Sequence, residues 1–341
     1  MFQLSGVTTL SNRAENAPQP NRPPPDGKAP VRIARTRDID EQAALLRGWN
    51  QSYDQISAGS FQGTFLEATL DRVHLFREVT SNALYQTGVL SAGTVAVGVP
   101  LALRGNATFC GRRCDGSQLH VFSGDDAFEF FSPCGLDIAG FVFDAEDFYG
   151  ALTADEQETM VHALGKPHLR SVTPQGADRL RQLFADVCDE LTQSPAIAVA
   201  PNRLSAMTRD IATALACALA FEQTDAGDPV PEPRRSRIVR QARELAAQGR
   251  DGSAITVEEL CRSVGVSRRA LQYCFLEILG IGPSAYLRAV RLNGARRAMK
   301  QATSVADAAA LWGFWHFGRF ARDYKSMFGE LPSEAFRRLH G

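Results

Sequence analysis

The sequence predicts a multidomain α+β protein, with a β-rich N-terminal barrel or sandwich that ends in helices and an all-α C-terminal domain. Three observations support this fold class. Short apolar runs with a period of two fill residues 53–144, helical periodicity follows over 145–223, and a two-helix unit occurs twice between 255 and 325. At 341 residues the chain can bury two separate cores.

Composition divides the chain into four parts. Residues 1–30 are rich in Pro and Asn, end in PQPNRPPPDGKAP, and are expected to form a disordered tail. Residues 31–223 form the first predicted domain, which opens with a short strand and a helix. The acidic, Pro-rich segment 224–233 is a predicted linker, and 234–341 form the C-terminal domain.

Helical segments close the first domain, and the last one carries a continuous apolar stripe. The stripe consists of Leu204, Met207, Ile211, Leu215 and Leu219, at the spacing of one helix face. Such a face either packs on the β-rich part as core or forms a dimer interface, and the sequence leaves both open.

Charge is distributed unevenly between the two predicted domains. From Arg234 onward there are 19 Lys and Arg against 9 Asp and Glu, a net charge of +10, whereas the preceding residues carry 18 against 29, a net charge of −11. A basic module suits a polyanionic partner, because phosphate contacts supply most non-specific affinity for nucleic acid. The acidic part is therefore expected to have a different task.

The repeated unit in the C-terminal domain has the pattern of a helix-turn-helix. The copies run from Val257 to Phe275 and from Val305 to Lys325, and Gly265 of the first aligns with Gly313 of the second. Glycine permits a tight turn at positive φ between two short helices. We therefore predict two helix-turn-helix units.

The second helix of each copy is predicted to expose hydrogen-bond donors around one buried residue, Leu271 or Phe320. These donors are Arg268, Arg269, Gln272 and Tyr273 in the first copy, and His316, Arg319, Arg322 and Lys325 in the second. Arginine suits the edge of guanine and glutamine the edge of adenine. One such helix could simply be a solvated surface, but two in tandem indicate DNA binding.

Helix starts are predicted from capping residues. Thr256 with Glu259 three positions later is typical of a capping box. Ser284 is expected to cap the long helix AYLRAVRLNGARRAMKQA, which joins the two units. One stiff helix would place the two second helices in successive major-groove turns on one face of the DNA.

Several motifs in the C-terminal domain match one family together. They are GVSRRALQ (265–272), GIGP (280–283), YLR (286–288), RLN (291–293), WGFWHFGRF (312–320) and FGELPS (328–333). Over about the last hundred residues the chain resembles the DNA-binding domain of AraC/XylS transcription regulators. The phrase LQYCF followed by GARR is most similar to regulators of ethanolamine and ornithine utilisation.

The resemblance implies a function and a set of partners. It implies an N-terminal cupin-like domain that binds a small-molecule effector, a homodimer, and a C-terminal domain that binds double-stranded promoter DNA. Most regulators in this family activate transcription, which implies RNA polymerase as a further partner.

Roles for individual side chains also follow from the resemblance. Contacts to base edges are implied for Arg269, Gln272, Tyr273, Phe317, Arg319 and Arg322. Contacts to phosphates, which position a protein without reading sequence, are implied for Ser267, Arg268, His316 and Lys325. Trp312 and Phe314 are predicted to be core residues, whereas Trp315 and Phe317 could pack or face the groove.

An enzymatic role is not expected. Cys110 and Cys114, with Cys134 and His120 nearby, could hold a metal or form a redox pair, but incidental thiols are the favoured interpretation because the spacing is not that of a zinc knuckle. The β-rich part has few histidines, and no catalytic motif or cofactor fingerprint is present. A catalytic cupin fused to a DNA-binding module, and a constitutive regulator whose N-terminal domain only oligomerises, are the two alternatives.

The expected location is the cytoplasm, without membrane association. No apolar run approaches the ~20 residues that cross a bilayer, and the N-terminal residues show no secretory signal.

Overall fold

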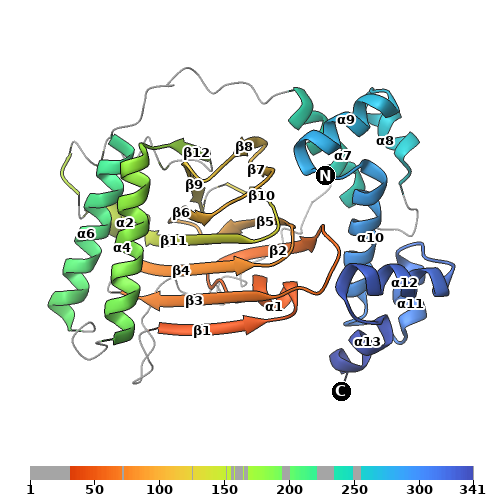
Figure 1. The fold of residues 1–341 in the computed structure, drawn as a ribbon, viewed down its shortest axis with the longest axis horizontal. Coiled ribbons are helices and arrows are strands. Elements are labelled where there is room, and N and C mark those ends of the chain that lie inside the picture. Colours follow the sequence, from red (N-terminus) through yellow and green to blue (C-terminus); the bar gives the residue numbers. More distant parts are fainter. Residues whose placement is uncertain are drawn as a thin grey trace, which may run out of the picture.

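The computed structural model describes residues 31–340, except 71–72, 125, 151, 155–156, 158–163, 165–167, 194–199, 221–233 and 249–254. The predicted tail (1–30) and linker (224–233) lie outside the described residues, as does most of the predicted helix near 154–165. The described chain has a sheet-rich N-terminal part and a helical C-terminal part (Figure 1).

The N-terminal part contains two antiparallel sheets. The larger has the order β1-β3-β4-β11-β6-β9-β12 and the smaller the order β2-β5-β10-β7-β8. The strands of the larger sheet are β1 Val31–Thr36, β3 Gly63–Thr69, β4 Val73–Thr80, β11 Leu136–Asp144, β6 Thr94–Ala102, β9 Gln118–Ser123 and β12 His168–Ser171. Those of the smaller sheet are β2 Trp49–Gln55, β5 Leu84–Leu90, β10 Phe128–Ser132, β7 Ala107–Phe109 and β8 Arg112–Cys114.

The barrel alternative for this part of the chain is wrong. Among the described strands no pairing joins the larger sheet to the smaller one, so each sheet keeps its own edges. A closed barrel needs an unbroken ladder around its circumference. The predicted strand and helix at the start of this part are confirmed as β1 and α1 Ile39–Ala43.

Aromatic side chains fill the space between the two sheets. Phe109 stacks on His120 at a centroid distance of 4.9 Å, and Phe122 meets Trp49 and Phe128, each at 4.9 Å. His120 is fully buried, and burial lowers its pKa to about 3, so it is neutral. This aromatic core fixes the distance between the sheets.

Helices α4 Pro174–Gln193 and α6 Pro201–Ala220 cover the larger sheet, on the side away from the C-terminal helices (Figure 1). A short helix, α2 Ala145–Gly150, leads out of β11. On α6 the side chains of Met207, Ile211, Leu215 and Leu219 are buried in the same cluster as the sheet and α4. The apolar stripe of this helix is therefore core.

Seven helices form the described C-terminal part. They are α7 Arg234–Gln248, α8 Val257–Val264, α9 Arg268–Leu279, α10 Pro283–Ala298, α11 Val305–Leu311, α12 Phe317–Phe328 and α13 Pro332–His340. The long helix α10 runs between two groups of helices, with α7, α8 and α9 at one end and α11, α12 and α13 at the other (Figure 1).

Helix α10 begins two residues earlier than an N-cap at Ser284 would place it. Gly282 occupies the N-cap position without a side-chain hydrogen bond, and Pro283 is the first helical residue. Proline suits this position because it lacks an N–H and its φ is already helical. The expectation that Ser284 caps the helix is wrong.

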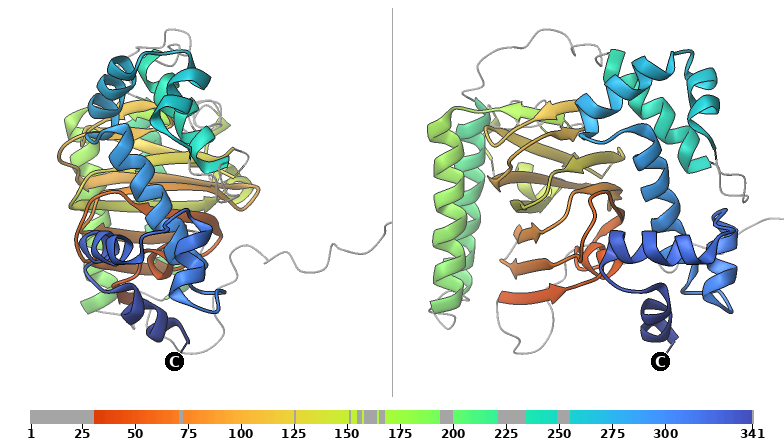
Figure 2. Two further views of the ribbon diagram at one scale, coloured as in Figure 1. Left: turned by 90° about the vertical axis from the view of Figure 1, so that its right-hand side faces the viewer. Right: turned by 45° about the vertical axis from the view of Figure 1, so that its right-hand side comes forward.

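The C-terminal helices pack directly on the smaller sheet (Figure 2). Ile56, Ala83 and Phe131 of the N-terminal part lie in one hydrophobic cluster with residues of α7, α9, α10 and α12. The Gln55 amide donates to the carbonyl oxygen of Met327 at 2.7 Å. The two parts therefore share a continuous apolar and polar interface.

Candidate nucleic-acid interface

The first helix pair, α8 and α9, has defined caps at each end. The hydroxyl of Thr256 accepts from the Glu259 N–H at 3.2 Å, and the Glu259 carboxylate accepts from the Thr256 N–H at 2.7 Å, which confirms the capping box. Gly265 ends α8 with φ of 72°. The Ser267 hydroxyl caps α9 by accepting from the Ala270 N–H.

Helix α9 exposes the four side chains that the sequence singled out. Arg268, Arg269, Gln272 and Tyr273 are exposed, and Leu271 between them is buried. Two of them already have protein partners. Arg268 pairs with Glu258 at 3.1 Å, and the guanidinium of Arg235 lies 4.9 Å from the Tyr273 ring.

The second helix pair, α11 and α12, repeats the arrangement. The Ser304 hydroxyl caps α11, and Gly313 has φ of 70°, close to the value of Gly265. Phe320 is buried in α12 as Leu271 is in α9. The predicted contact residues of this pair are all exposed: His316, Phe317, Arg319, Arg322 and Lys325.

The aromatic residues before α12 divide into packed and exposed groups. Phe314 lies 5.0 Å from the Phe320 ring, and Trp312 covers Gly294 so closely that a Cβ there would lie 2.3 Å from the indole. Both are partly buried and pack against the hydrophobic core of the C-terminal helices, in agreement with the prediction. Trp315 is 70% exposed and Phe317 47% exposed, so both face solvent.

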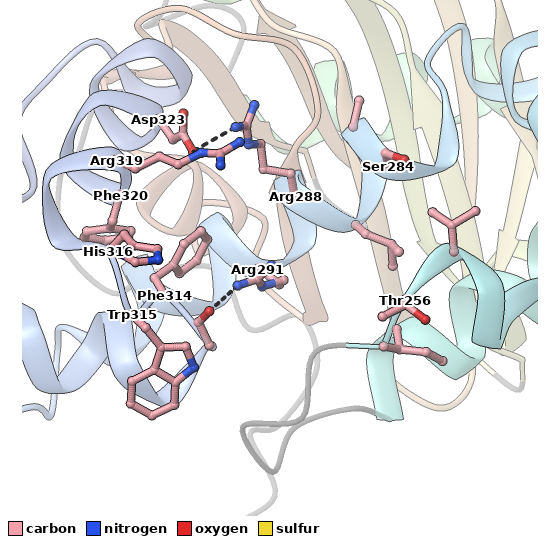
Figure 3. Close-up of a pocket in the computed structure, with 15 residues that line it drawn as sticks. Thr256, Ser284, Arg288, Arg291, Phe314, Trp315, His316, Arg319, Phe320 and Asp323 are labelled. Atoms are coloured by element: carbon pink, nitrogen blue, oxygen red, sulfur yellow. Dashed lines mark hydrogen bonds and ion pairs between the residues drawn. The ribbon is translucent and has the colours of Figure 1, made fainter.

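A groove of about 680 Å³ lies between the two helix pairs (Figure 3). Its walls bring Arg319 and His316 of the second pair together with Arg288 and Ser284 of α10 and with Thr256 of the first pair. Arg269, Gln272 and Tyr273 do not line this groove. Of the ten contact residues proposed from the sequence, only His316 and Arg319 line it.

Two arginines of α10 shape the groove. Arg288 pairs with Asp323 at 2.9 Å, and the same carboxylate lies 3.9 Å from Arg319 (Figure 3). Arg291 donates to the carbonyl oxygens of Trp312 and Gly313, at 2.9 and 2.5 Å, and stacks on Phe314. Arg291 thus holds the turn of the second pair in place.

Sequence reasoning did not foresee the residues that dock α10 on the N-terminal part. Arg296 forms a buried ion pair with Asp38, and Arg297 pairs with Asp54 at 2.6 Å. Although burial alone raises the pKa of Asp38, attraction to Arg296 leaves it below its ordinary value. The opposite charges of the two halves were the available signal, and they meet at this interface.

The cysteines near the β7–β8 hairpin are protonated thiols. Burial raises the pKa of Cys110 to about 11 and that of Cys114 to about 12, and a thiol rather than a thiolate is a poor metal ligand and nucleophile. Across the described residues, no group of three or more His, Cys, Asp or Glu is placed to hold a metal ion.

Comparison with known proteins identifies the family. A family model described as a helix-turn-helix domain matches residues 260–338. Over 131 residues the chain is 32% identical to the XylDLEGF operon transcriptional activator 2 of Pseudomonas putida, which is 37% of this chain and 80% of that protein. The chain belongs to the AraC/XylS family. Its curated relatives are named as operon regulators and transcriptional activators.

Other AraC/XylS relatives match over shorter shares of their length. A thc operon regulatory protein of Rhodococcus erythropolis is 39% identical over 111 residues, 31% of this chain and 33% of that protein. HrpB of Ralstonia nicotianae is 29% identical over 109 residues, 31% of this chain and 23% of that protein. This chain thus spans a third or less of the length of these two curated relatives.

Two solved structures of AraC-type regulators match this chain. The AraC-like transcriptional activator CuxR is 15% identical, covers 82% of this chain and all of its own, and gives a TM-score of 0.43. An AraC family regulator from Rhodopseudomonas palustris CGA009 is 36% identical, covering 30% of this chain and 97% of its own, with a TM-score of 0.28.

In the described part of this chain, no helix is both long and apolar enough to span a bilayer.

Proposed function

We propose that this AraC/XylS protein is a sequence-specific regulator that binds double-stranded promoter DNA and activates transcription through RNA polymerase. In this proposal residues 234–341 are the DNA-binding domain, and α8–α9 and α11–α12 are two helix-turn-helix units. The observation that carries the proposal is that α9 and α12 each expose several hydrogen-bond donors and are held by one helix, α10.

The chemistry of the exposed residues supports separate roles in DNA binding. Arg269, Gln272, Arg319 and Arg322 have the side chains that form paired hydrogen bonds with base edges. Phe317 offers an apolar surface for thymine methyl groups. We assign phosphate contacts to Ser267, Arg268, His316 and Lys325, and a further base contact to Tyr273. Ser267 also caps α9, and the Tyr273 ring also contacts Arg235.

The length of α10 supports binding to successive turns of one DNA face. A helix of 16 residues is about 24 Å long, and the two helix pairs lie beyond its ends (Figure 1). The helical repeat of DNA is about 34 Å. The helix pairs extend past the ends of α10, and this adds the distance that α10 alone does not span. In this arrangement one chain reads two adjacent groove segments.

For residues 31–223 we propose a cupin-like sensor of a small molecule that also forms a homodimer. The acidic charge of this part and its direct packing on α10 support a role in control rather than in DNA contact. We also propose that the chain belongs to the subgroup of ethanolamine and ornithine regulators. A domain that only oligomerises is the alternative.

Selection of bound sequences from a random DNA library with the full chain tests the proposal. We expect one motif with two half-sites about one helical turn apart. A library without enrichment, from protein that is folded and binds no probe above background, would refute sequence-specific binding. The selected motif then provides the matched specific and random probes for variants.

A further inference from the structure

The smaller sheet presents a row of polar side chains to the C-terminal helices. Ser52 of β2 pairs with Thr87 of β5, and Thr87 pairs with Glu129 of β10, so the three lie side by side on one face. Two residues further along β2, on the same face, Asp54 pairs with Tyr85. These residues point away from the aromatic core between the sheets.

A cleft of about 460 Å³ separates this row from α7 and α10. Its helical wall carries Arg240, Arg243 and Glu244 from α7, and Tyr286, Val290 and Arg297 from α10, while Trp312 closes one side. The volume lies within the range of small-molecule sites, and three aromatic rings line it. The space between the sheets, in contrast, is filled by aromatic side chains.

Arg243 is the central cation of the cleft. Its guanidinium stacks on the Tyr85 ring at 3.6 Å and donates to Glu129 at 3.0 Å, and the Tyr85 hydroxyl donates to the same carboxylate oxygen at 3.0 Å. Its Nε–H is buried and has no hydrogen-bond partner among the described residues. A buried donor without an acceptor is unfavourable, so the site favours a ligand that brings one.

The charge of Arg243 also favours a ligand that brings an acceptor. Burial lowers the pKa of Arg243 more than Tyr286, Asp54 and Glu244 raise it. The pKa of Arg243 thus lies below its ordinary value, although Glu129 is paired with it. An additional negative charge in the cleft would stabilise it.

We propose that this cleft binds a small planar organic carboxylate, with the carboxylate on Arg243 and the ring among Tyr85, Tyr286 and Trp312. The site deepens the proposed sensor function and rests on it. Because its walls come from the smaller sheet and from helices α7 and α10, a bound molecule contacts both parts of the protein at once.

Calorimetric titration of the full chain with three molecules of matched shape tests the site: indole-3-acetate, tryptamine and indole-3-ethanol. We expect the carboxylate to bind about 10- to 100-fold more tightly than the alcohol, which is the range of a hydrogen bond to a charged group, and tryptamine to bind least. Phenylacetate, run in parallel, covers a smaller ring. Equal affinity for acid and alcohol, preference for the amine, or no binding of either acid would overturn the proposal.

Two variants locate the binding. Val290→Phe fills the cleft without a change of charge and is expected to weaken binding of the acid by at least about tenfold. Arg243→Lys keeps the charge but removes the planar fork, and is expected to reduce the preference for acid over alcohol. Arg179→Lys, on the exposed face of α4, is the control and should bind as wild type. Unchanged affinity in Val290→Phe would place the ligand elsewhere and sink the proposal.

The same preparations separate this inference from the proposed function. Selective DNA binding without binding of either acid would refute the cleft alone. Binding of the acid without sequence-specific DNA binding would refute the regulator and leave the site intact.

Discussion

The side chain of Asn293 forms two hydrogen bonds with the backbone of Gln55. Its Oδ1 accepts from the Gln55 N–H at 3.0 Å, and its Nδ2 donates to the Gln55 carbonyl oxygen at 2.8 Å. Asn293 therefore gives the backbone at the end of β2 the two hydrogen bonds that a neighbouring strand would provide. This contact fastens the middle of α10 to the N-terminal part.

Replacement of Asn293 is expected to destabilise the protein. Asn293→Ala leaves the N–H and carbonyl of Gln55 buried without these partners, at a cost of about 1–3 kcal/mol in the free energy of unfolding. Urea unfolding measures the change, with Ser284→Ala on the exposed face of the same helix as the control. An unchanged midpoint in Asn293→Ala would show that water replaces the contact.

Glu78 is expected to make stability fall as pH rises. Burial raises its pKa to about 7, even though Gln42 and Tyr53 donate hydrogen bonds to it. Between its ordinary value of 4.5 and about 7, the folded state keeps a proton that the unfolded chain has lost, so the free energy of unfolding falls over this window by about 3 kcal/mol. Unfolding free energies of wild type and Glu78→Gln, measured from pH 4 to 8, should diverge by this amount. Parallel curves would contradict a protonated Glu78.

Any side chain at Gly265 is expected to lower the stability of the protein. Its φ of 72° is left-handed, and nothing lies within 4 Å of a Cβ built there, so the penalty of Gly265→Ala is conformational, about 1–2 kcal/mol. Gly318→Ala is the matched control, because Gly318 lies in α12 without positive φ and its Cβ also meets open space. There the better helix propensity of alanine should stabilise by up to about 1 kcal/mol. Thermal unfolding of both variants distinguishes the two effects, and equal shifts would argue against a strained turn.

Features set by local sequence were predictable. The turn glycines, the Thr256 capping box and the strand runs follow from preferences of single residues and short periods, and each is found in the structure. Ser284 failed as a cap because Pro283, next to it, is the stronger signal for a first helical position.

Features that depend on distant parts of the chain were not predictable. Asn293, Arg296 and Arg297 are polar positions of one helix, and nothing nearby in sequence shows that Gln55, Asp38 and Asp54 lie opposite them. For the same reason, the separation of the strands into two sheets, and the cleft beside Arg243, required the tertiary arrangement. The unequal charge of the two halves indicated attraction but not its location.

The proposed base contacts and phosphate contacts should differ in their effect on DNA binding. Arg319→Ala and Gln272→Ala should each reduce the preference for the selected motif over random DNA, by about 1–3 kcal/mol, because a base contact acts only on the right sequence. Lys325→Ala should weaken binding to both DNAs about equally and lower the salt dependence by about one unit, because a phosphate contact releases one counterion. Fluorescence anisotropy with both probes over a salt series measures these quantities.

Arg319 also lies 3.9 Å from Asp323, which Arg288 already neutralises, so loss of Arg319 should leave the fold of α12 intact. Equal losses on both DNAs for all three variants would show that neither Arg319 nor Gln272 reads sequence.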